Sequence, residues 1–202
     1  MSHKLGSVCV YCGSADRLHP DYLQAAYDLG AAIARRGWQL WYGAGSTGLM
    51  GAVADGALQA GGQVIGVIPS LFDTPALCHA GLTRLEVVDS MHQRKARLAA
   101  QADAFIALPG GYGTFEEFFE ILTWAQIGLH TKPVGLLNTR GYFEPLLALV
   151  EYARREGFIY AEHRGLPTSP RPVHNRSHWH RKVGALRCRA GHPGRHPDIS
   201  SR

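Results

Sequence analysis

The chain has 202 residues, of which 46% are hydrophobic and 18% charged, a length and composition typical of one globular domain rather than a disordered chain. It contains no run of 18 apolar residues, so we expect no transmembrane helix and no membrane partner. The segment 1–6 lacks the long apolar stretch of a signal peptide, and four cysteines are too few for a disulfide scaffold. We therefore expect a cytoplasmic protein.

The net charge of +5 is distributed unevenly along the chain. Residues 165–202 hold seven arginines, one lysine and a single acid, whereas residues 1–164 carry two more acidic than basic side chains. The body of the chain therefore has no basic excess with which to bind a phosphate backbone, and nucleic acid is not an expected partner.

The basic segment 165–202 also contains five of the eleven prolines and five of the eleven histidines, and it shows no helical or strand periodicity. Three interpretations remain open: a disordered basic arm that binds nucleic acid or acidic partners, a metal-binding tail that uses the pairs His174/His178 and His192/His196, and a tail without function that arose from a change of reading frame. The second requires a helix that this composition does not favour. We favour the third, and we expect one folded domain before the tail.

Before this tail, short apolar runs alternate with segments of helical periodicity, and each run predicts a buried strand covered by the helix that follows. The predicted strands are Ser7–Tyr11, Gln39–Tyr42, Val64–Ile68, Leu85–Val88, Ala104–Leu108 and Val134–Leu137. The predicted helices are Pro20–Arg36, Leu49–Ala60, Met91–Gln101, Phe115–Ile127 and Tyr142–Glu156, and residues 69–82 are expected to form an irregular loop. This alternation predicts an α/β, Rossmann-like, doubly wound parallel sheet with helices on both faces.

A glycine-rich segment at 43–48 reads G-A-G-S-T-G and follows the second predicted strand. An NAD site is disfavoured because no acid ends the next strand, and a Walker loop is excluded because Leu49 and Met50 stand where lysine and serine or threonine are required. Two interpretations remain, a phosphate-binding loop and a tight turn that needs glycine for steric reasons. We favour phosphate binding, with the candidate residues Gly43, Gly45 and Ser46.

A second glycine-rich segment, 109–117, reads P-G-G-Y-G-T-F-E-E and follows the fifth predicted strand. Thr114 and Glu117 have the spacing of a capping box, so Glu117 has a structural as well as a catalytic interpretation. The expected core face of this helix consists of Phe115, Phe118, Phe119, Leu122 and Ala125. That face would place Glu117 on the other side, near Ile121 and Trp124, in a cleft or subunit interface where a carboxylate is partly desolvated. We favour the catalytic interpretation.

The helix that precedes the fifth strand begins with Arg94, Lys95 and Arg97. These side chains form either a solvated face or a guanidinium clamp at the same edge of the sheet. The pair Cys9-x-x-Cys12 has no second ligand pair, so we interpret both as buried cysteines and predict no metal.

Together these residues resemble the Lonely-guy (LOG) family of cytokinin riboside 5'-monophosphate phosphoribohydrolases, whose members are often mislabelled as lysine decarboxylases. The resemblance extends from residue 7 to about residue 163. It rests on C-G-S at 12–14, Y-G-A-G-S-T-G-L-M-G at 42–51, M-H-Q-R-K at 91–95, P-G-G-x-G-T-x-x-E at 109–117, T-W-A-Q at 123–126 and K-P-V-G-L at 132–136. The sequence departs from the family pattern at Ala44, where a glycine is usual, at Ala76, where a glutamate is frequent, and after Arg164.

The resemblance implies hydrolysis of the N-glycosidic bond of N6-substituted adenosine 5'-monophosphates, with AMP as a further candidate, to a free base and ribose 5-phosphate. It implies no metal or cofactor, a homodimer or larger assembly, and catalytic roles for Arg94 and Glu117. The positions implied to contact the substrate are Lys95, Gly110, Gly111, Tyr112, Gly113, Thr114, Phe115, Glu116 and Thr123. The alternatives are a nucleotide-binding module without catalysis and a nucleic-acid-binding protein that acts through its tail. The pairing of a carboxylate with Arg94 favours an enzyme.

Overall fold

The computed structural model describes residues 6–159, so the predicted domain boundary at 164 and the tail at 165–202, with its histidine pairs, lie outside the described residues. The strands are β1 (Ser7–Tyr11), β2 (Gln39–Tyr42), β3 (Val64–Pro69), β4 (Arg84–Val88), β5 (Ala104–Ala107) and β6 (Val134–Leu136). The helices are α1 (Pro20–Arg35), α2 (Gly48–Gln59), α3 (Met91–Gln101), α4 (Tyr112–Gln126) and α5 (Glu144–Arg155). Two short 3-10 turns, η1 (Ser70–Phe72) and η2 (Thr139–Gly141), precede β4 and α5.

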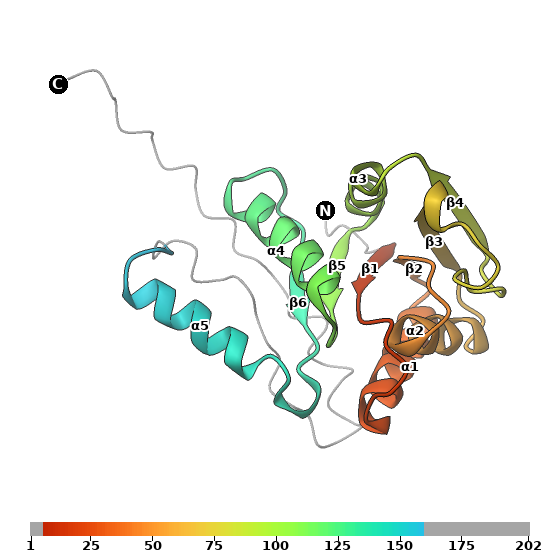
Figure 1. Cartoon of the computed structure of the whole chain (residues 1–202), viewed down its shortest axis with the longest axis horizontal. Helices are drawn as coiled ribbons and strands as arrows, with labels where there is room; N and C mark the ends of the chain where they lie inside the picture. Colours follow the sequence, from red (N-terminus) through yellow and green to blue (C-terminus); the bar gives the residue numbers. More distant parts are fainter. Residues whose placement is uncertain (1–5, 160–202) are drawn as a thin grey trace.

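The six strands form one parallel sheet in the order β4-β3-β2-β1-β5-β6. The chain adds strands outward from β1 in one direction and then returns to add β5 and β6 on the other side (Figure 1). The predicted doubly wound, Rossmann-like sheet is therefore confirmed. The order reverses between β1 and β5, and ligands of such sheets bind in the crevice outside the carboxyl ends of the strands at this point.

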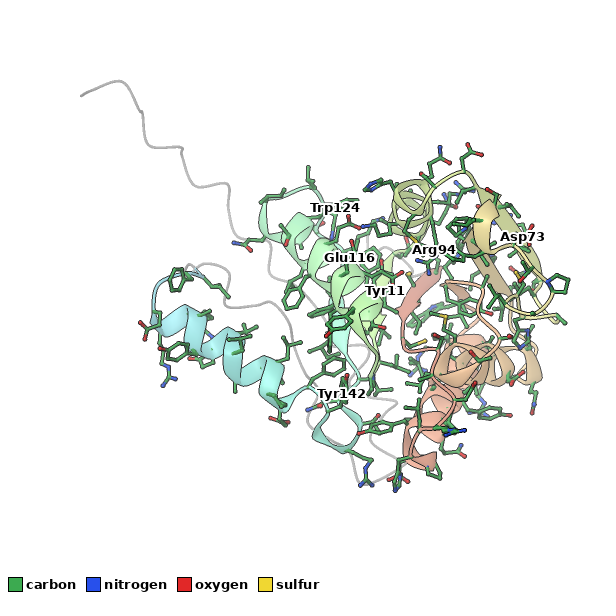
Figure 2. The ribbon with its side chains drawn as sticks, viewed as in Figure 1. Tyr11, Asp73, Arg94, Glu116, Trp124 and Tyr142 are labelled. Atoms are coloured by element: carbon green, nitrogen blue, oxygen red, sulfur yellow. The ribbon has the colours of Figure 1, made fainter. Side chains whose placement is uncertain are left out.

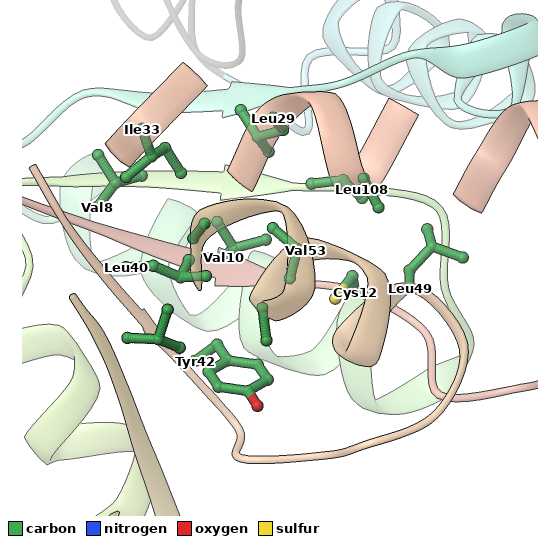
Figure 3. Packing of buried hydrophobic residues seen from close by; sticks show 14 residues of the cluster. Val8, Val10, Cys12, Leu29, Ile33, Leu40, Tyr42, Leu49, Val53 and Leu108 are labelled. Carbon is green, nitrogen blue, oxygen red and sulfur yellow. The ribbon is translucent and has the colours of Figure 1, made fainter. Parts of the chain in front are cut away.

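Two apolar layers cover the two faces of the sheet, because alternate side chains of a strand point to opposite faces. In β1, Val8 and Val10 pack with α1 and α2, as Figure 3 shows, whereas Cys9 and Tyr11 pack on the other face with α3 and α4. Nearly all of these strand residues are buried, which explains why the strands read as continuous apolar runs in the sequence.

Helix α4 begins three residues earlier than the sequence predicted, at Tyr112, and Gly111 occupies its N-cap position. Thr114 consequently lies inside the first turn and does not cap the helix, so the capping-box interpretation of Glu117 is wrong. The predicted core face is also wrong in part. The buried residues of α4 are Thr114, Glu117, Phe118 and Ile121, whereas Phe119 is 40% exposed. Glu117 therefore points into the protein together with Ile121, and not into a second apolar stripe.

No helix among residues 6–159 is long and apolar enough to cross a membrane. Within the same residues, no group of three or more histidine, cysteine, aspartate or glutamate side chains is arranged to hold a metal ion.

Candidate active site

The candidate site lies where the loops after β1 and β5 leave the sheet side by side. The Gly13 amide donates to the Pro109 carbonyl over 3.1 Å, and a Cβ on Gly13 would lie 3.1 Å from Gly110 Cα. Only residues without a side chain permit this approach of two backbones. The contact places the second glycine-rich segment at the reversal point of the strand order, where the fold predicts a ligand.

Along the first glycine-rich segment, 43–48, and the first residues of α2, four backbone amides donate to acceptors within the protein. Residues 44–46 pair with the segment 77–79, and the start of α2 is closed by the loop after β1. The bonds run from Ser46 N to Leu77 O (3.0 Å), from Gly48 N to Asp16 Oδ1 (3.2 Å), and from Leu49 N and Met50 N to Gly13 O (3.0 and 3.3 Å). These four donors are not available for a phosphate group. The amide of Ser46 is one of them, so Ser46 can offer a phosphate only its hydroxyl.

Ala44, which replaces the usual glycine, adopts the left-handed backbone conformation with a φ of 66°. This conformation costs an alanine roughly 1–2 kcal/mol, whereas a glycine adopts it freely. The Ala44 carbonyl accepts the His79 amide at 2.9 Å, so pairing of the loop holds the backbone in this conformation. Ala76, the other departure, is exposed between η1 and β4.

The N-terminus of α4 differs from that of α2. Within residues 6–159 no protein acceptor is assigned to the amides of Tyr112, Gly113 and Thr114, the first three residues of α4. A Cβ placed on Gly111 or Gly113 would meet no atom within 4 Å, so this turn faces open space. Tyr112 is 94% exposed. Free N–H groups at the positive end of a helix dipole bind anions.

Arg94 and Glu117 form a buried ion pair beside this turn, with 2.6 Å between Nη1 and Oε1. Arg94 is 8% exposed and Glu117 is 6% exposed. Arg94 comes from α3 and Glu117 from α4, and Figure 2 labels Arg94 and Glu116, the neighbour of Glu117. Burial of this kind is rare for charged side chains unless they are paired, so the two groups depend on one another. The structure thus brings together the two residues to which the family resemblance assigned catalysis.

Three contacts fix the position of the Arg94 guanidinium. Nε donates to the Val67 carbonyl at 3.1 Å, Nη1 binds Glu117, and Nη2 passes so close to Gly43 that a Cβ there would overlap it. Gly43 is therefore required because it leaves space for the guanidinium. The helix that carries Arg94 is started by Ser90, whose hydroxyl accepts the Gln93 amide at 3.2 Å.

Burial raises the pKa of Glu117, and the positive charge of Arg94 opposes that shift. The surroundings of the pair are dry: burial also raises the pKa of Tyr11, Cys9 and Cys12, so the phenol and both thiols stay protonated. The predicted burial of both cysteines is confirmed, and Cys9 and Cys12 are free thiols. A carboxylate with a raised pKa in a dry site is a stronger base than an exposed one.

Lys95 forms a second ion-pair cluster between α3 and α4. Its ammonium binds Glu116, and it binds Glu120 over 3.0 Å. Burial is the largest single influence on the pKa of Lys95 and lowers it. The hydrogen bonds and negative charges of Glu116 and Glu120 together outweigh burial, so the pKa of Lys95 is raised. Thr123 shares the helical face of Glu116 and Glu120, and nine residues separate it from Thr114, about 14 Å along α4. The structure therefore brings Arg94, Glu117 and the glycine turn together but places Thr123 away from that turn.

A hollow of about 600 Å³ lies at the opposite edge of the sheet, at the amino ends of β1 and β2. Its lining includes Trp38, Gln63 and Asp103, and it lacks a buried acid paired with a base. The buried ion pair of Arg94 and Glu117 lies at the other edge.

The comparisons with known proteins agree with this geometry. Residues 50–171 match the protein family described as "Possible lysine decarboxylase". The chain belongs to this family. It is 47% identical over 171 residues to a probable cytokinin riboside 5'-monophosphate phosphoribohydrolase of Oryza sativa subsp. japonica, covering 85% of this chain and 77% of the relative. It is 54% identical over 154 residues to the cytokinin riboside 5'-monophosphate phosphoribohydrolase of Rhodococcoides fascians, covering 76% and 78%. The resemblance to the Lonely-guy family is thereby confirmed.

Among solved structures, the molybdenum cofactor binding protein of Rippkaea orientalis superposes with a TM-score of 0.59 at 28% identity. The superposition covers 76% of this chain and 86% of that protein. The chain thus shares its architecture with a protein named for binding rather than for hydrolysis, so the side chains of the site must decide the function.

Proposed function

We propose that the protein hydrolyses the N-glycosidic bond of cytokinin riboside 5'-monophosphates, which are N6-substituted adenosine 5'-monophosphates, to a free base and ribose 5-phosphate. Relatives about half identical over most of the chain carry the name of this activity. The observation that supports it in the structure is the buried pair of Arg94 and Glu117, which lies next to the N-terminus of α4. A phosphate-binding protein without catalysis gains nothing from a buried carboxylate at this position.

The carboxylate matches the chemistry of the reaction. When the bond between the ribose C1' and the base nitrogen breaks, positive charge develops on the sugar, and an adjacent carboxylate stabilises it. Water then adds its oxygen to C1'. One of its protons ends on the base, which left with the electron pair of the broken bond. Glu117, with its raised pKa, would orient and deprotonate this water. Arg94 would keep Glu117 ionised and contact the ribose phosphate.

The 5'-phosphate would bind at the start of α4. Within residues 6–159 the amides of Tyr112, Gly113 and Thr114 have no protein acceptor and the space around Gly111 and Gly113 is open, whereas the corresponding donors of α2 are occupied. The ring of Phe115 and the carboxylate of Glu116 follow directly in the same turn. In this proposal the other candidate residues of the first segment border the site, Gly45 through its backbone and Ser46 through its hydroxyl.

The decisive experiment incubates the purified protein with isopentenyladenosine monophosphate, with AMP and with the corresponding riboside, and measures the released base by chromatography. We expect release from the nucleotide, and a far lower kcat/KM for the riboside, because it lacks the phosphate. Tight binding of the nucleotide without release of base would support the alternative, a nucleotide-binding module. Equal kcat/KM for nucleotide and riboside would contradict the phosphate site.

A homodimer is part of the proposal. No residue of α5 is fully buried, and exposed apolar side chains continue from this helix to the end of α4. They include Phe119, Ile127, Leu129, Leu149 and Phe158. A second copy that covers this face would remove it from water, which sedimentation at several protein concentrations would detect as a doubled mass. The free thiols of Cys9, Cys12 and Cys78 support the prediction of a cytoplasmic location.

A further inference from the structure

Tyr142 contacts the glycine turn from a part of the chain to which no role is assigned. It directly follows the turn η2, and its hydroxyl donates to the Gly110 carbonyl over 2.6 Å. The two residues are 32 positions apart. Figure 2 shows Tyr142 apart from Arg94 and Glu116, so it does not belong to the group of charged side chains around Glu117. Its polar contact with the site is the hydrogen bond to the glycine turn.

The ring of Tyr142 is held in place by its neighbours. It makes edge contacts with Phe143 and Tyr22, with ring centroids 5.1 and 6.2 Å apart, and it stacks on Phe115 with centroids 6.4 Å apart. Phe143 is buried, and its amide donates to the buried Asn138 side chain over 2.7 Å. The hydroxyl is consequently presented to Gly110 by a packed aromatic cluster rather than by a free side chain.

The bonded carbonyl belongs to the peptide that joins Gly110 to Gly111. In a trans peptide the C=O and the N–H of one unit point in opposite directions. A hydrogen bond that fixes the Gly110 carbonyl toward Tyr142 therefore fixes the Gly111 N–H away from Tyr142. Within residues 6–159 no protein acceptor is assigned to this N–H, and the space around Gly111 is open.

A peptide between two glycines needs such a restraint. Glycine adopts both signs of φ with similar ease, so this unit can reverse its direction at low cost. Close packing immobilises the Gly110 Cα, since a Cβ there would lie 2.8 Å from Gly13 N. A Cβ on Gly111, by contrast, would meet no atom within 4 Å, and Gly111 is held by its carbonyl, which accepts the Phe115 amide over 3.1 Å. A donor on the Gly110 carbonyl also polarises the peptide and strengthens its N–H as a donor.

We propose that Tyr142 is a positioning residue that locks the Gly110–Gly111 peptide, so that the Gly111 N–H joins the amides of α4 in binding the 5'-phosphate. This inference rests on the proposed function, because it assumes a phosphate group at the start of α4. It assigns Tyr142 a role in phosphate recognition and none in breaking the glycosidic bond.

The test compares wild type with Tyr142→Phe, which keeps the ring and its packing and removes only the hydroxyl. The matched control is Tyr152→Phe, which removes an exposed hydroxyl on α5. For each protein we would measure kcat and KM for the nucleotide and for its riboside, and the Kd of ribose 5-phosphate by calorimetry. The ratio of kcat/KM between the two substrates does not depend on the fraction of folded protein, so partial unfolding cannot imitate the effect.

We expect Tyr142→Phe to raise the KM for the nucleotide and the Kd for ribose 5-phosphate by about five- to ten-fold, the effect of one hydrogen bond. The kcat for the nucleotide and the kcat/KM for the riboside should stay within about two-fold, and Tyr152→Phe should match wild type. Equal losses for both substrates, or no loss, would overturn the role of Tyr142 while leaving the proposed function intact. A wild-type enzyme without preference for the nucleotide would instead refute the phosphate site, and with it this inference.

Discussion

Replacement of Glu117 by glutamine tests the proposed chemistry most directly. Glutamine has the same length, and its amide oxygen can still accept a hydrogen bond from Arg94 at the position of Oε1, which is 2.6 Å from Nη1 in the structure. Complete removal of one partner from a buried ion pair costs about 3–5 kcal/mol and would confuse stability with catalysis. Retention of the acceptor should limit the cost for Glu117→Gln to about 1–2 kcal/mol, so the protein should remain folded.

The loss of activity should be much larger than this loss of stability. A carboxylate that stabilises the ribosyl cation and activates water acts mainly in the transition state, so its removal should lower kcat by about 10²–10⁴, or about 3–5.5 kcal/mol. Binding of ribose 5-phosphate should change little, because the phosphate binds to α4 amides rather than to Glu117. Turnover would be followed as release of base, and stability as the melting temperature.

A matched control is available in the same sheet. Glu86 pairs with Arg97 over the same 2.6 Å, at β4 and outside the proposed site. Glu86→Gln should therefore keep kcat within about two-fold, although it breaks an ion pair of similar geometry at the protein surface. If Glu117→Gln retains near-normal turnover at an unchanged melting temperature, Glu117 is not catalytic and the main structural argument for an enzyme fails.

Three further predictions follow from the same geometry. Gly43→Ala should lower kcat by about ten- to a hundred-fold and also lower the melting temperature, because the new Cβ displaces the buried Arg94 guanidinium that pairs with Glu117; unchanged kinetics would contradict this view of the loop. The kcat should fall with decreasing pH, with a midpoint above the ordinary glutamate pKa of about 4.3, because Glu117 works ionised and its pKa is raised. Protonation of a group whose pKa is raised in the folded state does not destabilise the fold, so the melting temperature should hold through this loss of activity. A kcat profile that is flat down to about pH 4 would refute the prediction. Chains that end at Arg164 and at residue 171, where the family match ends, should both fold and retain activity, and an insoluble shorter chain would show that residues 165–171 are structural.

The fold could be predicted because it is encoded locally. The inner strands of the parallel sheet are buried on both faces, so a run such as Ser7–Tyr11 is apolar throughout and is recognised without knowledge of its partners, whereas the edge strand β4 is largely exposed. Every predicted strand and helix occurs within a few residues of its expected limits. The strand order follows from the connections, because short right-handed crossovers leave few alternatives.

The orientation of α4 could not be predicted with the same success. Four phenylalanines and leucines at helical spacing predicted a core face that includes Phe119, yet the structure buries Glu117 and Thr114 in its place. Apolar periodicity assumes that buried positions are apolar, and this assumption fails where a buried charge finds its partner on another helix. Arg94 supplies that partner from 23 residues away in the sequence, a distance that no local pattern covers.

The two glycine-rich segments illustrate the same limit in their backbones. Both end at the start of a helix and both look like anion sites in the sequence, because small residues and free N–H groups are properties of each segment alone. What separates them is the use of those N–H groups by distant acceptors. Gly13 and Asp16 fill the start of α2, whereas the start of α4 is left open. A phosphate at α4 would therefore meet donors that have no protein acceptor among residues 6–159, while at α2 it would have to displace hydrogen bonds that hold the loop after β1 in place.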